Sequence, residues 1–137
     1  MVGNAASLLP AESPFAPLAP DRVILANDGA VAFYDAFPLS RGHVLVVPRV
    51  PVVSLFELDR ETQAAVWDAV RQTRELLAER YSPDGFTIGV NDGKAAGQTV
   101  PHAHVHVIPR YEGDVPDPRG GIRWVIPKRA PYWTEET

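Results

Sequence analysis

Cysteine is absent from this chain of 137 residues. Its absence excludes disulfides, thiolate nucleophiles and cysteine-based metal sites, and it agrees with a cytoplasmic location. Lysine is scarce as well, since Lys94 and Lys128 are the only two. The formal net charge is −4, and the sequence shows no basic patch of the kind that neutralises nucleic-acid phosphates. We therefore expect no nucleic-acid partner, and an anionic ligand would have to be held by local donors.

Long hydrophobic runs are also missing. No stretch approaches the 18 consecutive apolar residues of a membrane-spanning helix. Residues 1–20 lack the basic segment and apolar run of a signal peptide. We therefore expect a cytoplasmic protein with no membrane partner. The chain is 45% hydrophobic, which is enough for a core, and its length indicates one domain.

Prolines concentrate at the two ends of the chain. Four lie in residues 1–20, and four more lie in residues 111–137 together with three glycines. Because proline blocks regular backbone pairing, these segments are expected to be irregular. We predict an N-terminal arm over residues 1–20, a domain over residues 21–110, and a C-terminal arm over residues 111–137. The C-terminal arm is expected to pack on the domain or on a partner chain.

The middle of the chain is regularly patterned. Apolar residues at helical spacing follow Asp59, a plausible N-cap, and predict one helix to about Tyr81. Short apolar segments bounded by turn residues predict five strands, at Val23–Ala26, Val31–Asp35, His43–Pro48, Phe86–Asn91 and His102–Arg110. One long helix beside about five mostly consecutive strands predicts an α+β domain built on an antiparallel sheet.

Three of the four histidines fall within five residues, at His102, His104 and His106. Since side chains alternate along a strand, all three would share one face, with neighbours about 6–7 Å apart. Ala103 and Val105 would then face the core. Neutral imidazole is a good nucleophile near pH 7, and the middle residue has a histidine on each side to orient it.

Two other interpretations of these histidines stay open at this point. They could be hydrogen-bonded histidines without a chemical role, or they could bind zinc, copper or iron. A metal site would need a further ligand from elsewhere. No carboxylate stands beside the strand in the sequence, and there is no cysteine.

A loop rich in small residues runs into the histidine strand. It lacks the Walker pattern, because no lysine–hydroxyl pair follows Gly97. Gly93, Gly97 and Thr99 could nevertheless turn successive backbone N–H groups toward one point, which would suit a phosphate. A plain flexible loop is the alternative.

These motifs together resemble the histidine-triad (HIT) superfamily, and in particular its bacterial proteins and its fragile-histidine-triad, diadenosine polyphosphate hydrolase branch. The resemblance covers about residues 22–126. It rests on Asn91-Asp92-Gly93, Ala96-Gly97-Gln98-Thr99-Val100, His102-x-His104-x-His106, Phe33-Tyr34-Asp35-Ala36-Phe37-Pro38 and Gly42-His43-Val44-Leu45-Val46-Val47-Pro48.

The resemblance implies a role for each matching residue. His104 is similar to the nucleophile that forms a nucleotidyl-histidine, with His102, His106 and Gln98 completing the catalytic set. Asp35 matches the position that binds the ribose hydroxyls. The remaining nucleotide-binding positions are Phe33, Tyr34, Asn91, Gly97, Thr99 and His43, and Val23, Ile24 and Phe37 are further candidates for the base. His43 resembles a supporting histidine with a structural rather than a chemical role.

The sequence departs from many bacterial relatives at their zinc site. Where they have Cys-Pro-Phe-Cys, this chain has Ser13-Pro14-Phe15-Ala16, and Arg49-Val50-Pro51 replaces a segment that would carry a histidine. Three of the four ligands are missing together, and we therefore expect no metal and no cofactor. Packing, for example through Phe15, would hold the N-terminal arm instead.

The resemblance implies a hydrolase that acts at the α-phosphate of a purine nucleotide conjugate, of the dinucleoside polyphosphate type. The alternatives are a nucleoside phosphoramidase, a nucleotidyl transferase or phosphorylase, and a regulatory nucleotide-binding protein with weak turnover. It also implies a homodimer, in which the C-terminal arm with Trp124 and Trp133 could reach the partner's site.

Overall fold

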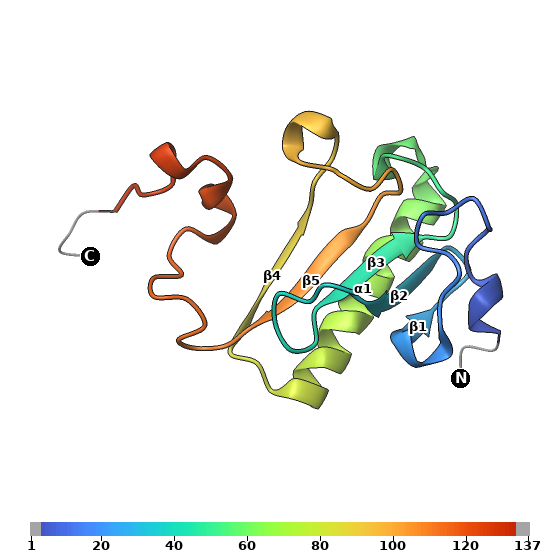
Figure 1. Cartoon of the computed structure of the whole chain (residues 1–137), viewed down its shortest axis with the longest axis horizontal. Helices are drawn as coiled ribbons and strands as arrows, with labels where there is room; N and C mark the ends of the chain where they lie inside the picture. Colours follow the sequence, from blue (N-terminus) through green and yellow to red (C-terminus); the bar gives the residue numbers. More distant parts are fainter. Residues whose placement is uncertain (1–3, 134–137) are drawn as a thin grey trace.

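The computed structural model describes residues 4–133; residues 1–3 and 134–137, the outer ends of the two predicted arms, lie outside the described part. Its centre is one five-stranded antiparallel sheet in the order β1-β2-β3-β5-β4, crossed by a single long helix (Figure 1). The elements are β1 (Val23–Ala26), β2 (Ala30–Tyr34), β3 (Val44–Pro48), α1 (Arg60–Tyr81), β4 (Gly85–Val90) and β5 (Val105–Arg110). Six short 3-10 helices lie outside these elements, at Ala5–Ser7, Pro20–Arg22, Leu55–Glu57, Lys94–Ala96, Gly121–Val125 and Pro127–Arg129. The predicted α+β class is confirmed.

Helix α1 begins and ends where its sequence predicts. The Asp59 side chain accepts a hydrogen bond of 2.8 Å from the Thr62 N–H, which satisfies one free donor of the first turn. Ser82 closes the helix in the left-handed conformation, with φ 48°. The buried positions of the helix recur at intervals of three and four and form one face, at Val66, Ala69, Val70, Thr73 and Leu77. Within residues 4–133, no helix is both long and apolar enough to cross a membrane.

The sheet is buried on both faces near β2 and β3. Alternate residues such as Ala32 and Val46 face α1, while Phe33 and Val47 face the N-terminal arm. The arm contributes apolar side chains of its own to this second cluster, chiefly Leu8, Leu9 and Leu18. The prolines of the arm prevent regular pairing, but its leucines still attach it to the sheet.

The N-terminal arm leaves part of the sheet face accessible beside β5. Leu45 of β3 belongs to the arm-covered cluster and pairs in register with His106 of β5, which places the two side chains on the same face. Val105 and Val107 point to the opposite face and are buried against α1. The predicted alternation along the histidine strand is therefore present from Val105 onward.

The histidine strand is shorter than predicted. Strand β5 begins at Val105, whereas the pattern predicted a start at His102. The backbone before Val105 is bonded elsewhere: the Ala103 N–H donates to the Val52 carbonyl at 2.8 Å, and the His102 N–H donates to the Val100 carbonyl at 2.9 Å. These bonds turn His102 away from the ladder, and its side chain enters the protein interior.

Gly42 occupies a tight turn before β3 and supplies a test of the fold. Its φ is +90°, and an added Cβ would lie 2.8 Å from the Tyr81 ring. We expect Gly42→Ala to lower the free energy of unfolding by about 1–2 kcal/mol, because it combines backbone strain with a steric clash. Urea unfolding monitored by circular dichroism measures this. Gly85→Ala is the matched control, since nothing lies within 4 Å of its added Cβ; equal losses for both variants would contradict the prediction.

Candidate active site

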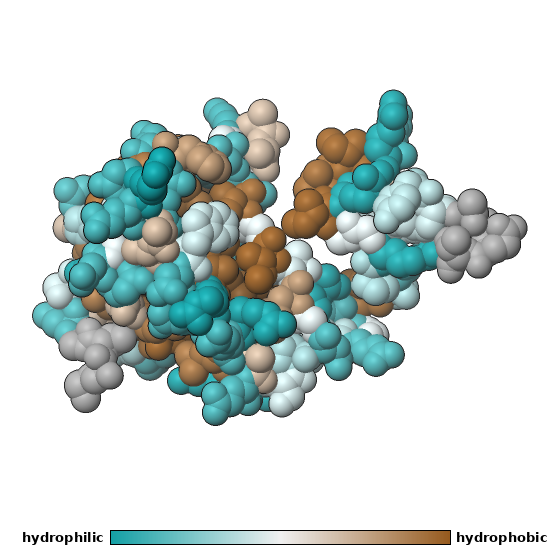
Figure 2. All heavy atoms as spheres, turned by 180° about the vertical axis from the view of Figure 1, so that it is seen from behind, coloured by the Kyte–Doolittle hydropathy of each residue, from teal (hydrophilic) through white to brown (hydrophobic). Residues whose placement is uncertain are grey.

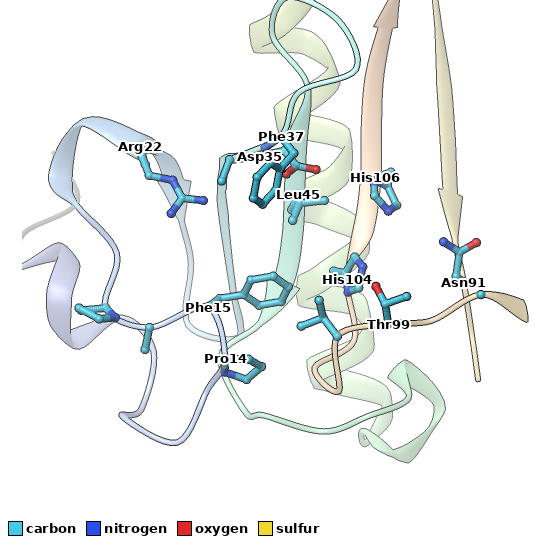
Figure 3. Close-up of a pocket in the computed structure, with 15 residues that line it drawn as sticks. Pro14, Phe15, Arg22, Asp35, Phe37, Leu45, Asn91, Thr99, His104 and His106 are labelled. Atoms are coloured by element: carbon cyan, nitrogen blue, oxygen red, sulfur yellow. Dashed lines mark hydrogen bonds between the residues drawn. The ribbon is translucent and has the colours of Figure 1, made fainter. Parts of the chain in front are cut away.

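The histidines line a cavity of about 660 Å³ between the N-terminal arm, the β3–β5 face and the glycine-rich loop (Figure 3). This volume is typical of a small-molecule site. Residues from four distant segments form its wall: Pro14, Phe15, Ala16, Pro17, Arg22, Asp35, Ala36, Phe37, Leu45, Asn91, Gly97, Thr99, Val100, His104 and His106. Several segments that the sequence analysis treated separately therefore meet at one place.

One ring nitrogen of His104 is hydrogen-bonded to the backbone, and the other is available at the cavity. Its Nδ1 lies 2.8 Å from the His102 carbonyl oxygen. Because a carbonyl can only accept, Nδ1 must carry the hydrogen, and Nε2 of the neutral ring then keeps its lone pair. The residue is only 8% exposed, and the accessible part lines the cavity. This tautomer is the one required for attack through Nε2.

A second hydrogen-bonded chain fixes the tautomer of His106. The Leu39 N–H donates to His43 Nδ1 at 3.0 Å, and His43 Nε2 must therefore carry the hydrogen when the ring is neutral. That hydrogen is donated to His106 Nδ1, at 3.0 Å. Neutral His106 consequently carries its own hydrogen on Nε2. Its ring centroid lies 5.2 Å from that of His104, so the cavity has one imidazole with a free lone pair beside another with a donor.

Burial keeps the supporting histidines neutral. Desolvation first, and then the electrostatic influence of His104 and His43, lower the pKa of the His106 imidazole to about 4, against an opposing effect of Asp35. Desolvation also lowers the pKa values of His43 and His102 below the ordinary histidine value. These three rings are therefore uncharged near pH 7.

The fold brings a carboxylate to the histidines although none stands beside them in the sequence. Asp35 Oδ2 lies 3.5 Å from His43 Nε2, and Oδ1 accepts a 2.9 Å bond from the Phe37 N–H. The ligand-type atoms of Asp35, His43 and His106 lie within 4.8 Å of one another. His43 is hydrogen-bonded to His106 and to the Leu39 N–H, and Asp35 to the Phe37 N–H, so each of the three groups has a partner within the protein.

His102 does not line the cavity, and its side chain is hydrogen-bonded within the protein interior. It is fully buried, its Nε2 donates to the Pro48 carbonyl at 2.8 Å, and the Ser13 hydroxyl then donates to its Nδ1 at 2.8 Å. Ser13 Oγ in turn accepts from the Phe15 N–H at 3.1 Å. His102 thus links the N-terminal arm to β3, while its carbonyl oxygen holds the ring of His104.

The residues at the positions of the relatives' zinc site do not suit zinc. Ser13 is engaged with His102, and Ala16 has no donor atom. Arg49 brings a positive charge and is bonded to the Leu8 and Asn27 carbonyls at 3.0 and 3.4 Å. A hydrogen bond and apolar packing join the arm to the sheet here instead.

Ser13 therefore supplies a testable contribution to stability. We expect Ser13→Ala to lower the free energy of unfolding by about 1 kcal/mol, because it leaves a buried acceptor on His102 without its donor. Chemical denaturation measures the change. The control is Ser7→Ala, which removes an exposed hydroxyl bonded to the Asn4 carbonyl. A loss no larger than that of the control would contradict the assignment of the Ser13–His102 bond.

The glycine-rich loop bends toward the cavity. Gly93 and Gly97 have φ values of +98° and +93°, the left-handed region that glycine favours. Asn91, Gly97 and Thr99 line the cavity, as their predicted role requires. Gln98 does not line it, because its side chain closes the loop: Oε1 accepts from the Gly93 N–H at 2.9 Å, and Nε2 donates to the Val53 and Val100 carbonyls at 2.9 and 3.0 Å.

Two aromatic residues predicted at the base lie elsewhere. Phe33 is fully buried under the N-terminal arm, and Tyr34 bonds to the Tyr81 hydroxyl at 2.9 Å on the other side of the sheet. Strand alternation sends Tyr34 to the face opposite the cavity, whereas Phe33 lies on the same face as Leu45 but is covered by the arm. Eight lining residues were not predicted as site residues: Pro14, Phe15, Ala16, Pro17, Arg22, Ala36, Leu45 and Val100. The pattern treats Leu45 as core, and Arg22 has no motif around it. Only its place before a predicted strand could have drawn attention to Arg22.

The fold and the site together define a class of protein in which a strand presents histidines to a groove beside a glycine-rich loop. The sequence model of the HIT domain matches residues 17–113. The chain therefore belongs to the HIT family.

Similar proteins agree with this assignment. An uncharacterized 16.1 kDa HIT-like protein from Mycoplasma pneumoniae is 42% identical over 86 residues, which cover 63% of this chain and 60% of the relative. The asymmetrical bis(5'-nucleosyl)-tetraphosphatase of Schizosaccharomyces pombe is 39% identical over 85 residues, which cover 62% of this chain and 47% of the relative. The chain thus spans between about half and two thirds of these relatives. The chain also resembles the crystal structure of a zinc-bound histidine triad family protein from Mycobacterium smegmatis, with a TM-score of 0.64 and 37% sequence identity. The aligned part covers 72% of this chain and 76% of the Mycobacterium smegmatis chain.

Proposed function

We propose that this protein hydrolyses a dinucleoside polyphosphate or a similar nucleotide conjugate at its α-phosphorus, through a nucleotidyl-histidine intermediate on His104. One observation carries the proposal: the His102 carbonyl holds Nδ1–H of His104 and leaves Nε2 as the nucleophilic nitrogen at the cavity. The similarity to a bis(5'-nucleosyl)-tetraphosphatase favours the same substrate class.

The cavity has distinct ends for the parts of a nucleotide. His104, Thr99 and Asn91 lie at one end, where their polar side chains can meet a phosphate (Figure 3). The Asp35 carboxylate lies farther along and suits the two ribose hydroxyls. The apolar side chains of Phe15, Phe37 and Leu45, which suit a base, lie between the histidines and Arg22. A nucleoside monophosphate unit can span these groups in one orientation.

The reaction proceeds in two displacements. The Nε2 lone pair of His104 forms a bond to the α-phosphorus, and the bond from that phosphorus to the bridging oxygen breaks. The electron pair leaves with the departing polyphosphate. The His104 ring becomes cationic, and its Nδ1–H bond to the His102 carbonyl stabilises that charge. Water then attacks the phosphorus and the N–P bond breaks. This restores neutral His104 and releases the nucleoside monophosphate, and the proton from water passes to solvent.

The neutral state of the supporting histidines favours a polyphosphate leaving group. A polyphosphate departs as a stable anion and needs no proton, whereas the amine of a phosphoramidate must be protonated as it leaves. His106 has a pKa of about 4, so its ring is almost wholly in the neutral form near pH 7. It can donate a hydrogen bond from Nε2 to a phosphoryl oxygen, but it is a poor source of a proton. We therefore favour anhydrides over amidates.

A substrate panel tests the proposal. Purified protein is incubated with adenosine and guanosine dinucleoside tri- and tetraphosphates, an AMP-lysine amidate and ADP, and the products are separated by ion-exchange chromatography. We expect a nucleoside monophosphate and the complementary nucleotide from the dinucleoside polyphosphates, with slower cleavage of the amidate at pH 7. No product from any substrate, while nucleoside monophosphate still binds, would leave the regulatory alternative. Faster cleavage of the amidate would favour the phosphoramidase.

A homodimer is part of the same proposal. β4 forms an edge of the sheet, and the C-terminal arm beyond β5 exposes apolar side chains (Figure 2). Ile122, Val125 and Ile126 are 58%, 72% and 58% exposed. A second copy covering them would remove an exposed apolar patch from water. Light scattering should give about twice the 15.0 kDa of the chain, and a mass of one chain at micromolar concentration would contradict this.

A further inference from the structure

Arg22 lies at the end of the cavity opposite the histidines. In Figure 3 its guanidinium extends toward the slot formed by Phe15, Phe37 and Leu45, with His104 on the far side of that slot. Arg22 closes the 3-10 helix Pro20–Arg22, directly before β1. No function described so far uses this residue.

The Arg22 guanidinium is fixed in place while part of its donor edge remains available. Its Nη2 and Nε donate to the Tyr34 carbonyl at 3.0 and 3.3 Å, and its Cζ lies 5.2 Å from the centroid of the buried Phe33 ring. Within residues 4–133, no carboxylate forms an ion pair with it. An arginine has five N–H donors, and these contacts use only the edge that faces Tyr34. The Nη1 side is left with donors, and its position is set before a ligand arrives.

The slot beside Arg22 has the shape and chemistry for a flat base. Phe37 is 85% exposed and contributes to the cavity wall, and Phe15 packs 5.5 Å from the His104 ring. Aromatic and aliphatic walls bind the faces of a base with little selectivity, because every base has such a face. Selectivity must come from the polar groups at the rim, and Arg22 offers donors only.

We propose that Arg22 determines base specificity and that the site prefers a 6-oxopurine nucleotide, such as a guanosine nucleotide, over an adenosine nucleotide. The O6 and N7 atoms of guanine are adjacent acceptors that suit two guanidinium N–H groups. Adenine has an amino donor in place of O6, which would face the Arg22 donors without a bond. This inference rests on the proposed function, because it assumes that a nucleotide occupies the cavity with its phosphate at His104.

A phosphate is a poorer ligand for Arg22 than a base edge. A phosphate chain running from His104 to Arg22 would place charged oxygens against Phe15, Phe37 and Leu45, and burying those charges among apolar side chains is costly. His104, Thr99 and Asn91, whose polar side chains suit a phosphate, lie at the other end of the cavity.

Calorimetric titration with GMP, IMP and AMP tests the inference. IMP has the O6 and N7 acceptors of GMP but lacks its 2-amino group, so it isolates the predicted contact. We expect GMP and IMP to bind at least about fivefold more tightly than AMP. Arg22→Met keeps an unbranched side chain over Phe33 and should weaken GMP and IMP to the level of AMP while leaving AMP almost unchanged. Arg74→Met is the matched control, since that guanidinium lies 4.9 Å from the centroid of Phe86, outside the cavity lining; it should keep the preference.

The possible outcomes separate this inference from the proposed function. Equal affinities for the three nucleotides, or tighter binding of AMP, in the unaltered protein would overturn the base preference alone, whatever the stability of the variants. Equal weakening of all three by Arg22→Met would identify Arg22 as a phosphate ligand and also overturn it. Failure of every nucleotide to bind would overturn both the proposed function and the inference.

Discussion

Replacement of His104 by alanine should lower kcat for a dinucleoside polyphosphate by at least about 10⁴-fold. The proposed reaction has no other nucleophile, and losing the group that forms a covalent intermediate is among the largest single effects known in enzymes. The His102 carbonyl, the loop and Asp35 are untouched by this change. The affinity for a nucleoside monophosphate should therefore stay within about threefold of the original.

Three measurements make this prediction specific. Single-turnover kinetics give the rate of the chemical step, calorimetry gives the affinity for the monophosphate, and intact mass spectrometry after rapid acid-free quenching detects a nucleotidyl adduct. The adduct should form on the unaltered protein and be absent from His104→Ala. Gln98→Ala is a useful comparison, since Gln98 closes the loop and does not line the cavity; it should retain the adduct. Unchanged turnover in His104→Ala would disprove nucleophilic catalysis by His104.

The secondary structure could be predicted because local chemistry decides it. Asp59 caps the helix and the buried positions of α1 follow its period, so the element is recognisable without tertiary information. The five strands were also recognised, with their ends displaced by one residue in several cases and by three at β5. The β5 error has a tertiary cause, because the bonds that turn His102 inward go to Val52, Pro48 and Ser13, which are distant in sequence.

The site was only partly predictable for the same reason. Repetition at every second residue pointed to His104 and His106, but nothing in the sequence pairs His43 with His106 or Asp35 with His43. Gln98 shows the opposite problem. Its place in a motif suggested a catalytic role. In the structure, however, its amide oxygen accepts a hydrogen bond from the loop, and its amide nitrogen donates one to the Val53 carbonyl. A motif identifies which residues matter, and only the hydrogen bonds show what each of them contacts.

The hydrogen bonds of the four histidines form two short chains that start from backbone groups. Leu39 fixes His43, which fixes His106, while Pro48 and Ser13 fix His102, whose carbonyl fixes His104. The first chain works only when His43 is neutral, because a protonated His43 would carry a hydrogen on Nδ1 that faces the Leu39 N–H donor. The arrangement that prepares the site should therefore be sensitive to acid.

Acidification from pH 7.5 to pH 5 should lower the free energy of unfolding by about 1 kcal/mol through His106 alone. The pKa of His106 in the folded protein is about 4, whereas its ordinary value is 6.5. Between these values the unfolded chain binds more protons than the folded one, and stability falls as pH falls. The full shift would give about 2 kcal/mol over this pH range, and screening by solvent of a ring that is only partly buried reduces it to about 1 kcal/mol. His43 and His102 also have lowered pKa values and add to the loss in the same direction.

The carboxylates act in a different pH range and do not obscure this effect. The pKa values of Asp59, Asp68, Asp114 and Asp117 are all below the ordinary aspartate value, so their stabilising contributions are lost only below about pH 4. Urea unfolding at half-unit steps from pH 7.5 to pH 5 measures the slope. His106→Gln keeps a polar side chain that does not titrate, and it should make the slope shallower by the His106 contribution. A free energy of unfolding that is constant across this range, or that rises toward pH 5, would contradict the assignment of neutral, buried histidines.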